Sequence, residues 1–460
     1  MINMVYPSDY ENKTGFDRIR AQVRGKCTTD GGRALLDGEG FSASAGEIAH
    51  RLSLCSELQE ILMLESGFPL QEYTDIGPVA RKIEVACTFL DIEDMIALRA
   101  GLGAVNEITV FLAAKEEGRY PVLRGLAQGV ESFPEITGHI DTILDRYGKI
   151  KDSASPELYT IRRTIRDREG QVSKRLQAIL SKAQKDGYAD ADAAVSIRDG
   201  RAVIPVSAAN KRKINGFIHD ESATGKTFYI EPVEIVEINN ELKELEYAER
   251  REVVRILTAF TDRIRPDAPG IARAGEYLAC MDMIRAKARW AAENECVKPV
   301  LSEEGTLWLR SARHPLLRQT LAREGKQVVP LDLKLDRGRR MLVISGPNAG
   351  GKSVCLKTVG LLQYMFQCGF PVPVLENSEF PVFDGIFIDI GDEQSIDNDL
   401  STYSSHLLNM KHMLAGAGSG SLVLIDEFGS GTEPVIGGAI AEAILERFVE
   451  TGTYGVITTH

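Results

Sequence analysis

The sequence predicts a multidomain protein in which an all-α part, two long helices and a small β-rich insert precede an α/β domain. Three observations support this prediction. Apolar residues recur at helical spacing through the first 150 residues. Two polar helical segments with narrow apolar stripes then flank a β-rich stretch. From about residue 301, apolar runs of strand length alternate with helical patterns, which is typical of a parallel sheet wound with helices.

The first part, residues 1–155, is expected to be a helical core. Its apolar residues repeat every three or four positions, as on one face of a helix. Examples are Ile48, Leu52, Leu58, Ile61 and Leu62, and then Val85, Phe89, Ile92 and Ile96. No catalytic or ligand-binding motif is evident here.

Residues 156–194 and 233–300 are expected to form the two sides of a helical lever arm. The ascending helix covers 156–186, with Pro156 in its first turn, and the returning helix covers 233–264 before the chain rejoins the core. Both segments carry many charges and a thin, nearly heptad stripe. The alternative is two separate amphipathic helices on a core, and we favour the arm. The stripes are Leu158, Ile161, Ile165, Val172, Leu176 and Ile179, and Ile235, Ile238, Leu242, Leu245, Ile256, Phe260 and Ile264.

Between the arm helices, residues 195–232 are short β-rich runs broken by Gly, Asn and Asp, which predict a small antiparallel sheet. From Arg198 to Lys226 there are six basic and three acidic residues. This charge suggests a clamp-like insert that contacts nucleic acid, and the alternative is a solvated hairpin. His219 is expected to be structural. The candidate nucleic-acid contacts are Arg198, Arg201, Lys211, Arg212, Lys213 and Lys226.

The α/β part, residues 301–460, has four strand candidates separated by helical patterns: Met341–Ile344, Gly385–Ile388, Leu422–Ile425 and Gly455–Ile457. The first strand leads into a glycine-rich loop, then Lys-Ser and a helical pattern. This is the context of a phosphate-binding P-loop, because loop N–H groups and a helix N-terminus can surround phosphate oxygens. The predicted nucleotide-binding residues are Gly346, Pro347, Asn348, Ala349, Gly350, Gly351, Lys352, Ser353 and Val354.

Side chains for phosphoryl chemistry follow the other strands. Lys352 would reach the β- and γ-phosphates, while Ser353 and Asp426 would hold Mg²⁺. Glu427, next to Asp426 at a strand end, is placed to activate the attacking water. His460, at the end of the last strand, is a candidate γ-phosphate sensor.

Two further residues have a local alternative. Gln394 could sense Mg²⁺ or the water, although an acidic surface loop explains it nearly as well. Ser401 could meet a nucleotide held by a partner subunit, and the alternative is a helix N-cap.

Composition adds little to function. The formal net charge of −12 excludes a protein that is basic all over, but not a local basic patch. The seven cysteines form no CxxC pair, which fits a reducing compartment. No apolar run approaches a membrane span, and no signal pattern begins the chain, so a cytoplasmic protein without membrane contact is expected.

Together these residues resemble the ABC-type ATPase domain of the MutS family. The matching motifs are GPNAGGKS, STYSSH, LIDEFGSGT and ITTH, with Ser311-Ala312-Arg313-His314-Pro315 upstream. IGDEQSI, LSTYSSHL and KTVGLL are similar to its type-two branch, called MutS-two. DGRAVIPV, GFIHDESATGKTFYIEP and INNELKELE look like the arm and clamp of that branch.

The resemblance implies an ATP- and Mg²⁺-dependent ATPase that works as a homodimer. ATP held at each P-loop would face the partner's Ser401 segment, and helical arms would transmit closure to clamps around DNA. The expected target is branched or structured DNA, with a role in limiting recombination. The alternative is an ATPase that acts on stalled or collided ribosomes and contacts rRNA.

Departures from the family limit these expectations. There is no room for the N-terminal mismatch-reading domain, and Phe133-Pro134-Glu135 is taken as a chance match to its wedge. The sequence is expected to stop before the ATPase fold is complete and to lack the small nuclease-like (Smr) domain, so no nuclease activity is predicted.

Overall fold

The computed structural model describes residues 5–69, 72–346, 351–391, 402–429 and 433–459. The chain divides into two compact units. Unit 1 comprises Met1–Gly77, Ala100–Ser132 and Ala272–His460, and it contains all the predicted nucleotide-site residues. Unit 2 comprises Pro78–Arg99 and Phe133–Ile271, and it contains both long helices and the β-rich insert.

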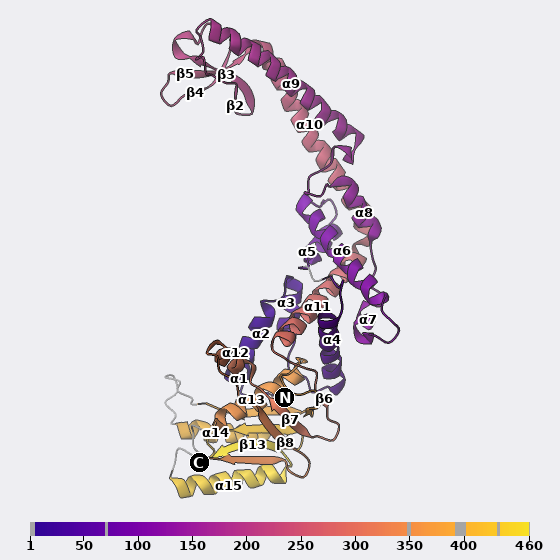
Figure 1. Ribbon diagram of the computed structural model, residues 1–460, viewed down its shortest axis with the longest axis vertical. Coiled ribbons are helices and arrows are strands. Elements are labelled where there is room, and N and C mark those ends of the chain that lie inside the picture. Colours follow the sequence, from indigo (N-terminus) through magenta and orange to yellow (C-terminus); the bar gives the residue numbers. More distant parts are fainter. Residues whose placement is uncertain (1–4, 70–71, 347–350, 392–401, 430–432, 460) are drawn as a thin grey trace. The chain divides into compact units, whose positions relative to one another are not determined.

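Unit 2 is organised around two long helices, α9 (Pro156–Lys185) and α10 (Val233–Ile264) (Figure 1). Ser155 caps α9 by accepting a hydrogen bond from the Leu158 N–H. Ion pairs join Arg162 to Glu249 at 2.8 Å and Arg168 to Glu241 at 2.9 Å. The later residue of α9 pairs with the earlier residue of α10, so the two helices are antiparallel, as the sequence predicted. Shorter helices accompany them: α5 (Gly77–Glu84), α8 (Pro134–Ile143), η1 (Asp152–Ala154), η2 (Ala208–Asn210) and η3 (Arg265–Asp267).

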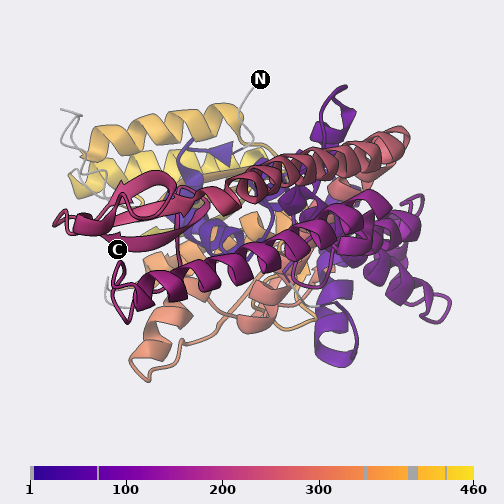
Figure 2. The same ribbon diagram turned by 90° about the horizontal axis from the view of Figure 1, so that it is seen from above.

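A four-stranded antiparallel sheet lies at one end of the α9–α10 pair (Figures 1 and 2). Its strands are β2 (Ser196–Arg198), β3 (Arg201–Ser207), β4 (Gly216–Glu221) and β5 (Thr227–Pro232), in the order β2-β3-β5-β4. Ile204 and Ile230 of the sheet pack with Leu176 of α9 and Ile235 of α10 in one buried cluster. Burying these side chains stabilises the sheet on the helices, because a small sheet needs an apolar partner.

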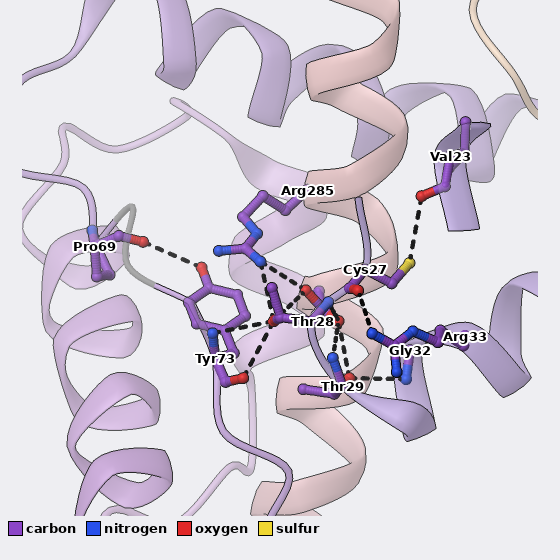
Figure 3. A network of polar contacts seen from close by, with 10 residues as sticks. Val23, Cys27, Thr28, Thr29, Gly32, Arg33, Pro69, Tyr73 and Arg285 are labelled. Atoms are coloured by element: carbon purple, nitrogen blue, oxygen red, sulfur yellow. Dashed lines mark hydrogen bonds and ion pairs between the residues drawn. The ribbon is translucent and has the colours of Figure 1, made fainter. Parts of the chain in front are cut away.

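A polar network that includes Thr28, Thr29, Tyr73 and Arg285 joins segments of the helical part of unit 1 (Figure 3). Its central carboxylate is that of Asp282, a fully buried residue of α11. The Asp282 carboxylate accepts hydrogen bonds at 2.8 Å from the N–H groups of Thr28 and Thr29, and from Arg285. Arg285 also lies over the Tyr73 ring, 4.2 Å from its centroid. A charge this deeply buried is tolerated because it is paired and hydrogen-bonded. Helices of this part are α1 (Tyr10–Thr14), α2 (Phe16–Arg24), α3 (Asp30–Gly38), α4 (Ala45–Leu64) and α7 (Pro121–Ala127). Most of α6 (Ile92–Ala113) and of α11 (Ala268–Glu293) also belongs to unit 1, while the first residues of both helices belong to unit 2.

The rest of unit 1 contains two sheets. One is parallel, in the order β1-β11-β12-β13-β9, and the other is mixed, in the order β6-β10-β7-β8. The four strands predicted from the sequence are β9, β11, β12 and β13. The strands are β1 (Val5–Tyr6), β6 (Val300–Leu301), β7 (Leu307–Ala312), β8 (Leu331–Leu335), β9 (Met341–Ser345), β10 (Glu379–Phe380), β11 (Gly385–Asp389), β12 (Ser421–Ile425) and β13 (Tyr454–Thr459), and the helices are α12 (Pro315–Arg323), α13 (Lys352–Gln367), α14 (Thr402–Gly416) and α15 (Pro434–Glu450).

Helices cover both faces of the parallel sheet. Val423 and Ile425 of β12 pack with Met413 of α14 and Phe448 of α15 in one buried cluster. Leu424, which points to the other face as neighbours in a strand do, meets α13, and a Cβ on Gly360 would lie 2.9 Å from its Cδ1. The sheet is therefore buried on both sides, which explains its nearly continuous apolar strands.

The chain's start belongs to this parallel sheet, which the sequence analysis did not predict. Val5 and Tyr6 pair with Ile386 and Phe387 of β11. The Tyr10 hydroxyl then donates to the Gly360 carbonyl at 3.0 Å. A two-residue strand leaves no periodic pattern, so only tertiary pairing identifies it.

Helix α6 corrects one expectation, namely that no segment reaches the apolar length of a membrane span. It has 22 residues and a mean hydropathy of 1.4 in its most apolar window, 44% of which is buried. Length and composition alone do not separate a span from a core helix, but its fully buried residues form one stripe, as a core helix requires. They are Met95, Leu98, Leu102, Val105, Ile108 and Leu112.

Candidate nucleotide-binding site

The parallel strands end together at one edge of the sheet, and the predicted chemistry lies there. Ser345 ends β9, Asp389 ends β11, Ile425 ends β12 and Thr459 ends β13. Asp426 follows β12 directly, and its N–H donates to the Asp389 carbonyl at 2.9 Å. The carboxyl ends of parallel strands are where α/β sheets bind ligands, so this edge is the candidate site.

Lys352 is the first residue of α13 and is buried in spite of its charge, with 6% exposure. Gly351 precedes it in the left-handed conformation, at φ 80°, which glycine adopts without strain. The Lys352 ammonium donates to the carbonyl of Gly346 and, at 2.9 Å, to that of Thr459. The lysine therefore connects the residue after β9 with the last residue of β13.

Asp426 and Glu427 are fixed by β13. The Thr458 hydroxyl donates to Asp426 Oδ1 and accepts from the Glu427 N–H at 2.9 Å. Glu427 has φ 50°, a left-handed backbone that is unusual for a side chain other than glycine. Such backbone strain persists only where the surroundings enforce it, and it concentrates at functional sites.

A pocket of about 250 Å³ lies between these groups. It brings together Ser353, Asp426 and Glu427, whose hydroxyl and carboxylate oxygens suit Mg²⁺. It also contains Lys357 and His406, which the sequence analysis did not select. The lining residues are Ser353, Lys357, Ile390, Gly391, His406, Asp426 and Glu427.

His406 belongs to a chain of hydrogen bonds that begins at the sheet edge. Its Nδ1 lies 2.6 Å from Asp389 Oδ2, and Asp389 is only 2% exposed. Asp389 Oδ1 accepts from the Asn409 amide at 2.9 Å, and Asn409 accepts from the Tyr6 hydroxyl at 2.7 Å. These partners come from β1, β11 and α14, so no local sequence spacing predicted them.

Several predicted residues lie outside the described part of the chain. They are Pro347, Asn348, Ala349, Gly350, Gln394, Ser401 and His460. Of the nucleotide-binding set, Gly346, Gly351, Lys352, Ser353 and Val354 are described, and Val354 is exposed on the first turn of α13.

His314, in the Arg313-His314-Pro315 motif, caps helix α12. Its Nδ1 accepts from the Leu317 N–H at 3.4 Å. Burial, with the positive charges of Lys357 and Arg18, lowers the pKa of His314 to about 4. His314 lines a cavity of about 360 Å³ together with Val354 and Lys357 of α13. It therefore lies near the first turns of α13 as a neutral imidazole.

The predicted nucleic-acid residues on the unit 2 sheet have different surroundings. Arg201 donates to Glu231 at 2.9 and 3.1 Å and to Asn240 at 2.8 Å, so its guanidinium is used within the fold. Arg198 pairs with Asp220 at 3.1 Å and lies over Tyr229.

The other four basic residues are exposed at the opposite end of β3. The Ala208 N–H donates to the Lys226 carbonyl at 2.8 Å, which joins the loop after β3 to the β4–β5 turn. Lys211 also lies over the Phe228 ring, 4.4 Å from its centroid. The turns that carry Lys211, Arg212, Lys213 and Lys226 therefore meet at this end.

The part of the chain that contains this candidate site is similar to known proteins. Residues 342–460 match the family model described as MutS domain V. Proteins named "Endonuclease MutS2" are 35% identical in Geobacillus sp. strain WCH70, 37% in Thermomicrobium roseum and 39% in Pelotomaculum thermopropionicum. The first two alignments cover 97% of this chain and the third covers 88%.

The chain spans 56%, 57% and 50% of the lengths of these three relatives. The similarity is not confined to the P-loop region, because the alignments extend through nearly all of the helical part as well. Residues 342–460 match a MutS domain, and the similarity to MutS2 proteins covers 97% of this chain in two of the alignments. The chain therefore belongs to the MutS family, in its MutS2 branch.

Proposed function

We propose that the chain binds and hydrolyses Mg²⁺-ATP. The observation that carries this proposal is the shared pocket, in which Ser353 of the P-loop helix faces Asp426 and Glu427 of the neighbouring strand. When ATP binds, the Lys352 ammonium would leave the carbonyls of Gly346 and Thr459 and contact the β- and γ-phosphates. Ser353 and Asp426 would hold Mg²⁺, which neutralises phosphate charge, and Glu427 would accept a proton from the attacking water.

Nucleotide-binding measurements with a fluorescent ATP analogue test this assignment. Lys352→Ala should weaken binding by roughly 100-fold, because a buried charge contact is lost. Lys326→Ala, which removes an exposed lysine paired with Glu324, is the matched control and should bind normally. Glu427→Gln should keep binding and slow hydrolysis by roughly 100-fold or more. Equal binding by wild type and Lys352→Ala would contradict the proposal.

We further propose that a homodimer uses ATP to close on branched or structured DNA, limiting recombination without reading mismatches. The exposed basic end of the unit 2 sheet supports a phosphate-backbone contact. The relatives named "Endonuclease MutS2" support a DNA-related role. Sealing of the site by the partner's Ser401 segment remains part of this proposal.

Binding of a four-way junction and a linear duplex at several salt concentrations tests the DNA target. Lys211→Glu with Lys213→Glu should weaken binding and reduce the salt slope by about two, one for each lost phosphate contact. Arg323→Glu with Lys326→Glu in unit 1 is the charge-matched control. Weak binding that is equal for both DNAs and insensitive to salt contradicts a DNA clamp. Co-sedimentation with ribosomes that survives nuclease treatment would favour the ribosomal alternative.

A further inference from the structure

The cavity that His314 lines, which we call the basic cavity, has a one-sided charge. Its volume of about 360 Å³ falls in the range of roughly 300 to 1,000 Å³ that is usual for small-molecule pockets. It is enclosed by α1, α2, α12, α13 and the residues that cap them. No aspartate or glutamate is among the described residues that line it, which are Asn12, Lys13, Thr14, Gly15, Arg18, His314, Leu316, Leu317, Thr320, Val354 and Lys357.

Two cations of the basic cavity are not neutralised by the fold. Within the described part of the chain, neither the Arg18 guanidinium nor the Lys357 ammonium has a hydrogen-bond or ion-pair partner. The carboxylates that lie nearest along the chain do not fill this role. Glu11 pairs with Arg20 at 2.7 Å, and Asp17 does not line the cavity. Two positive charges in one cavity without an acid attract an anion.

His314 is close enough to both cations to respond to them. Burial lowers its pKa to about 4, and the positive charges of Lys357 and Arg18 lower the pKa further in the same direction. Since Nδ1 accepts from the Leu317 N–H, the proton of the neutral ring lies on Nε2. This Nε2–H has no hydrogen-bond partner among the described residues, so the ring is a third donor at the cavity.

We propose that the basic cavity binds a phosphate group, either the free ion or one carried by a small organic molecule. Arg18 and Lys357 are its charged contacts, and His314 is a neutral donor. A guanidinium matches phosphate oxygens with parallel hydrogen bonds. A phosphate also has more acceptor oxygens than a carboxylate, so it can meet donors from three different helices. The proposal does not rest on ATP hydrolysis, because Ser353, Asp426 and Glu427 line a separate pocket.

The imidazole of His314 provides a direct measurement of binding. In ¹⁵N-histidine spectra at pH 7, its signals are identified by their absence from His314→Asn. Inorganic phosphate or ribose 5-phosphate, added at constant ionic strength, should shift these signals until they saturate, with a Kd of roughly 1 mM. Tenfold tighter binding of ribose 5-phosphate would identify an organic phosphate as the ligand, and equal binding would identify the free ion.

Arg18→Gln is the decisive variant, because Arg18 lines only the basic cavity whereas Lys357 also lines the candidate nucleotide pocket. It should weaken phosphate binding by roughly tenfold, and so should Lys357→Gln. Arg24→Gln is the matched control. It removes an arginine of the same helix that pairs with Asp37 outside the cavity, and it should bind phosphate normally. Circular dichroism melting reports whether each variant keeps its fold.

A further variant separates this cavity from the candidate nucleotide site, which also suits phosphate. Lys352→Ala should lose ATP binding and keep the phosphate response of His314. The inference is overturned if Lys352→Ala abolishes that response, if Arg18→Gln leaves it unchanged, or if the wild-type signals do not saturate. A wild-type protein that binds no ATP but shows the His314 response would refute the proposed ATPase and leave this inference standing.

Discussion

The two units each contain a buried carboxylate paired with an imidazole, but the pairs have different surroundings. In unit 2, Glu231 lies 2.5 Å from His219 and also accepts from Arg201 and Asn239, all within the fold. In unit 1, Asp389 lies 2.6 Å from His406 and accepts from Asn409, and no arginine is among its hydrogen-bond partners in the described residues. The first pair also contacts a cation, Arg201, whereas the imidazole of the second pair lines a pocket.

This difference teaches that a short carboxylate–imidazole contact does not by itself identify a functional site. Burial alone would raise the pKa of Glu231, but hydrogen bonds from Asn239, His219 and Arg201 lower it below the usual value. All of these donors serve to stabilise the ionised form inside the sheet. The two imidazoles differ in position, because His406 lines the candidate nucleotide site and His219 does not.

The sharpest test of the comparison makes the matched isosteric change in each pair. Glu231→Gln leaves Arg201 beside a neutral amide and should cost about 3 kcal/mol of unit 2 stability, as for other buried ion pairs that lose one partner. Asp389 has no arginine among its hydrogen-bond partners in the described residues, so Asp389→Asn should cost less, about 1 kcal/mol. Hydrogen exchange of the β5 and β11 backbone amides measures each unit locally.

Exposed Glu221, on the neighbouring strand β4, provides the control, and Glu221→Gln should leave exchange in β5 unchanged. Equal losses for Glu231→Gln and Asp389→Asn would show that the two carboxylates contribute equally to stability. Because the pKa of Glu231 is depressed in the fold, its contribution should be present above its ordinary pKa and be lost as pH falls through the folded value.

His314 should give a smaller effect of pH on stability. It is an imidazole near the cations Lys357 and Arg18, whereas Glu231 is a carboxylate that accepts hydrogen bonds. Its folded pKa of about 4 lies below the ordinary value of 6.5. Between these values the unfolded chain binds a proton that the folded chain does not, so stability falls as pH drops from 6.5 towards 4. The loss should be about 2 kcal/mol after allowance for partial exposure.

His314→Asn keeps the helix cap, since Asn is a good N-cap residue, but it does not titrate. Denaturant midpoints of the two proteins from pH 7 to pH 4 therefore measure the histidine's share of the acid sensitivity. A variant that loses as much stability as the wild-type protein would assign that sensitivity to other groups.

Local patterns in the sequence predicted what local chemistry determines. Apolar runs located the strands, and glycines followed by Lys352 predicted a P-loop, which stays a prediction because residues 347–350 lie outside the described part of the chain. Asp426 and Glu427 were found because they follow a strand directly. Periodicity likewise predicted α9 and α10 within a residue or two of their observed bounds.

Contacts between distant residues could not be predicted in this way. Asp389 and His406 meet only because β11 and α14 pack together, 17 residues apart in the chain. Arg201 was predicted to contact nucleic acid, but in the fold it pairs with Glu231, which lies 30 residues further along the chain. Strand β1 is too short for a pattern and pairs with a strand about 380 residues away.

The pairing of Val5 and Tyr6 with β11 has a practical consequence for handling the protein. Deleting these residues would expose the backbone amide and carbonyl groups along one edge of β11. A strand of another polypeptide could then pair with that edge and lead to aggregation. The same deletion would remove the Tyr6 hydroxyl that steadies Asn409. Purification tags and truncations at this end should therefore leave residues from Val5 onward intact.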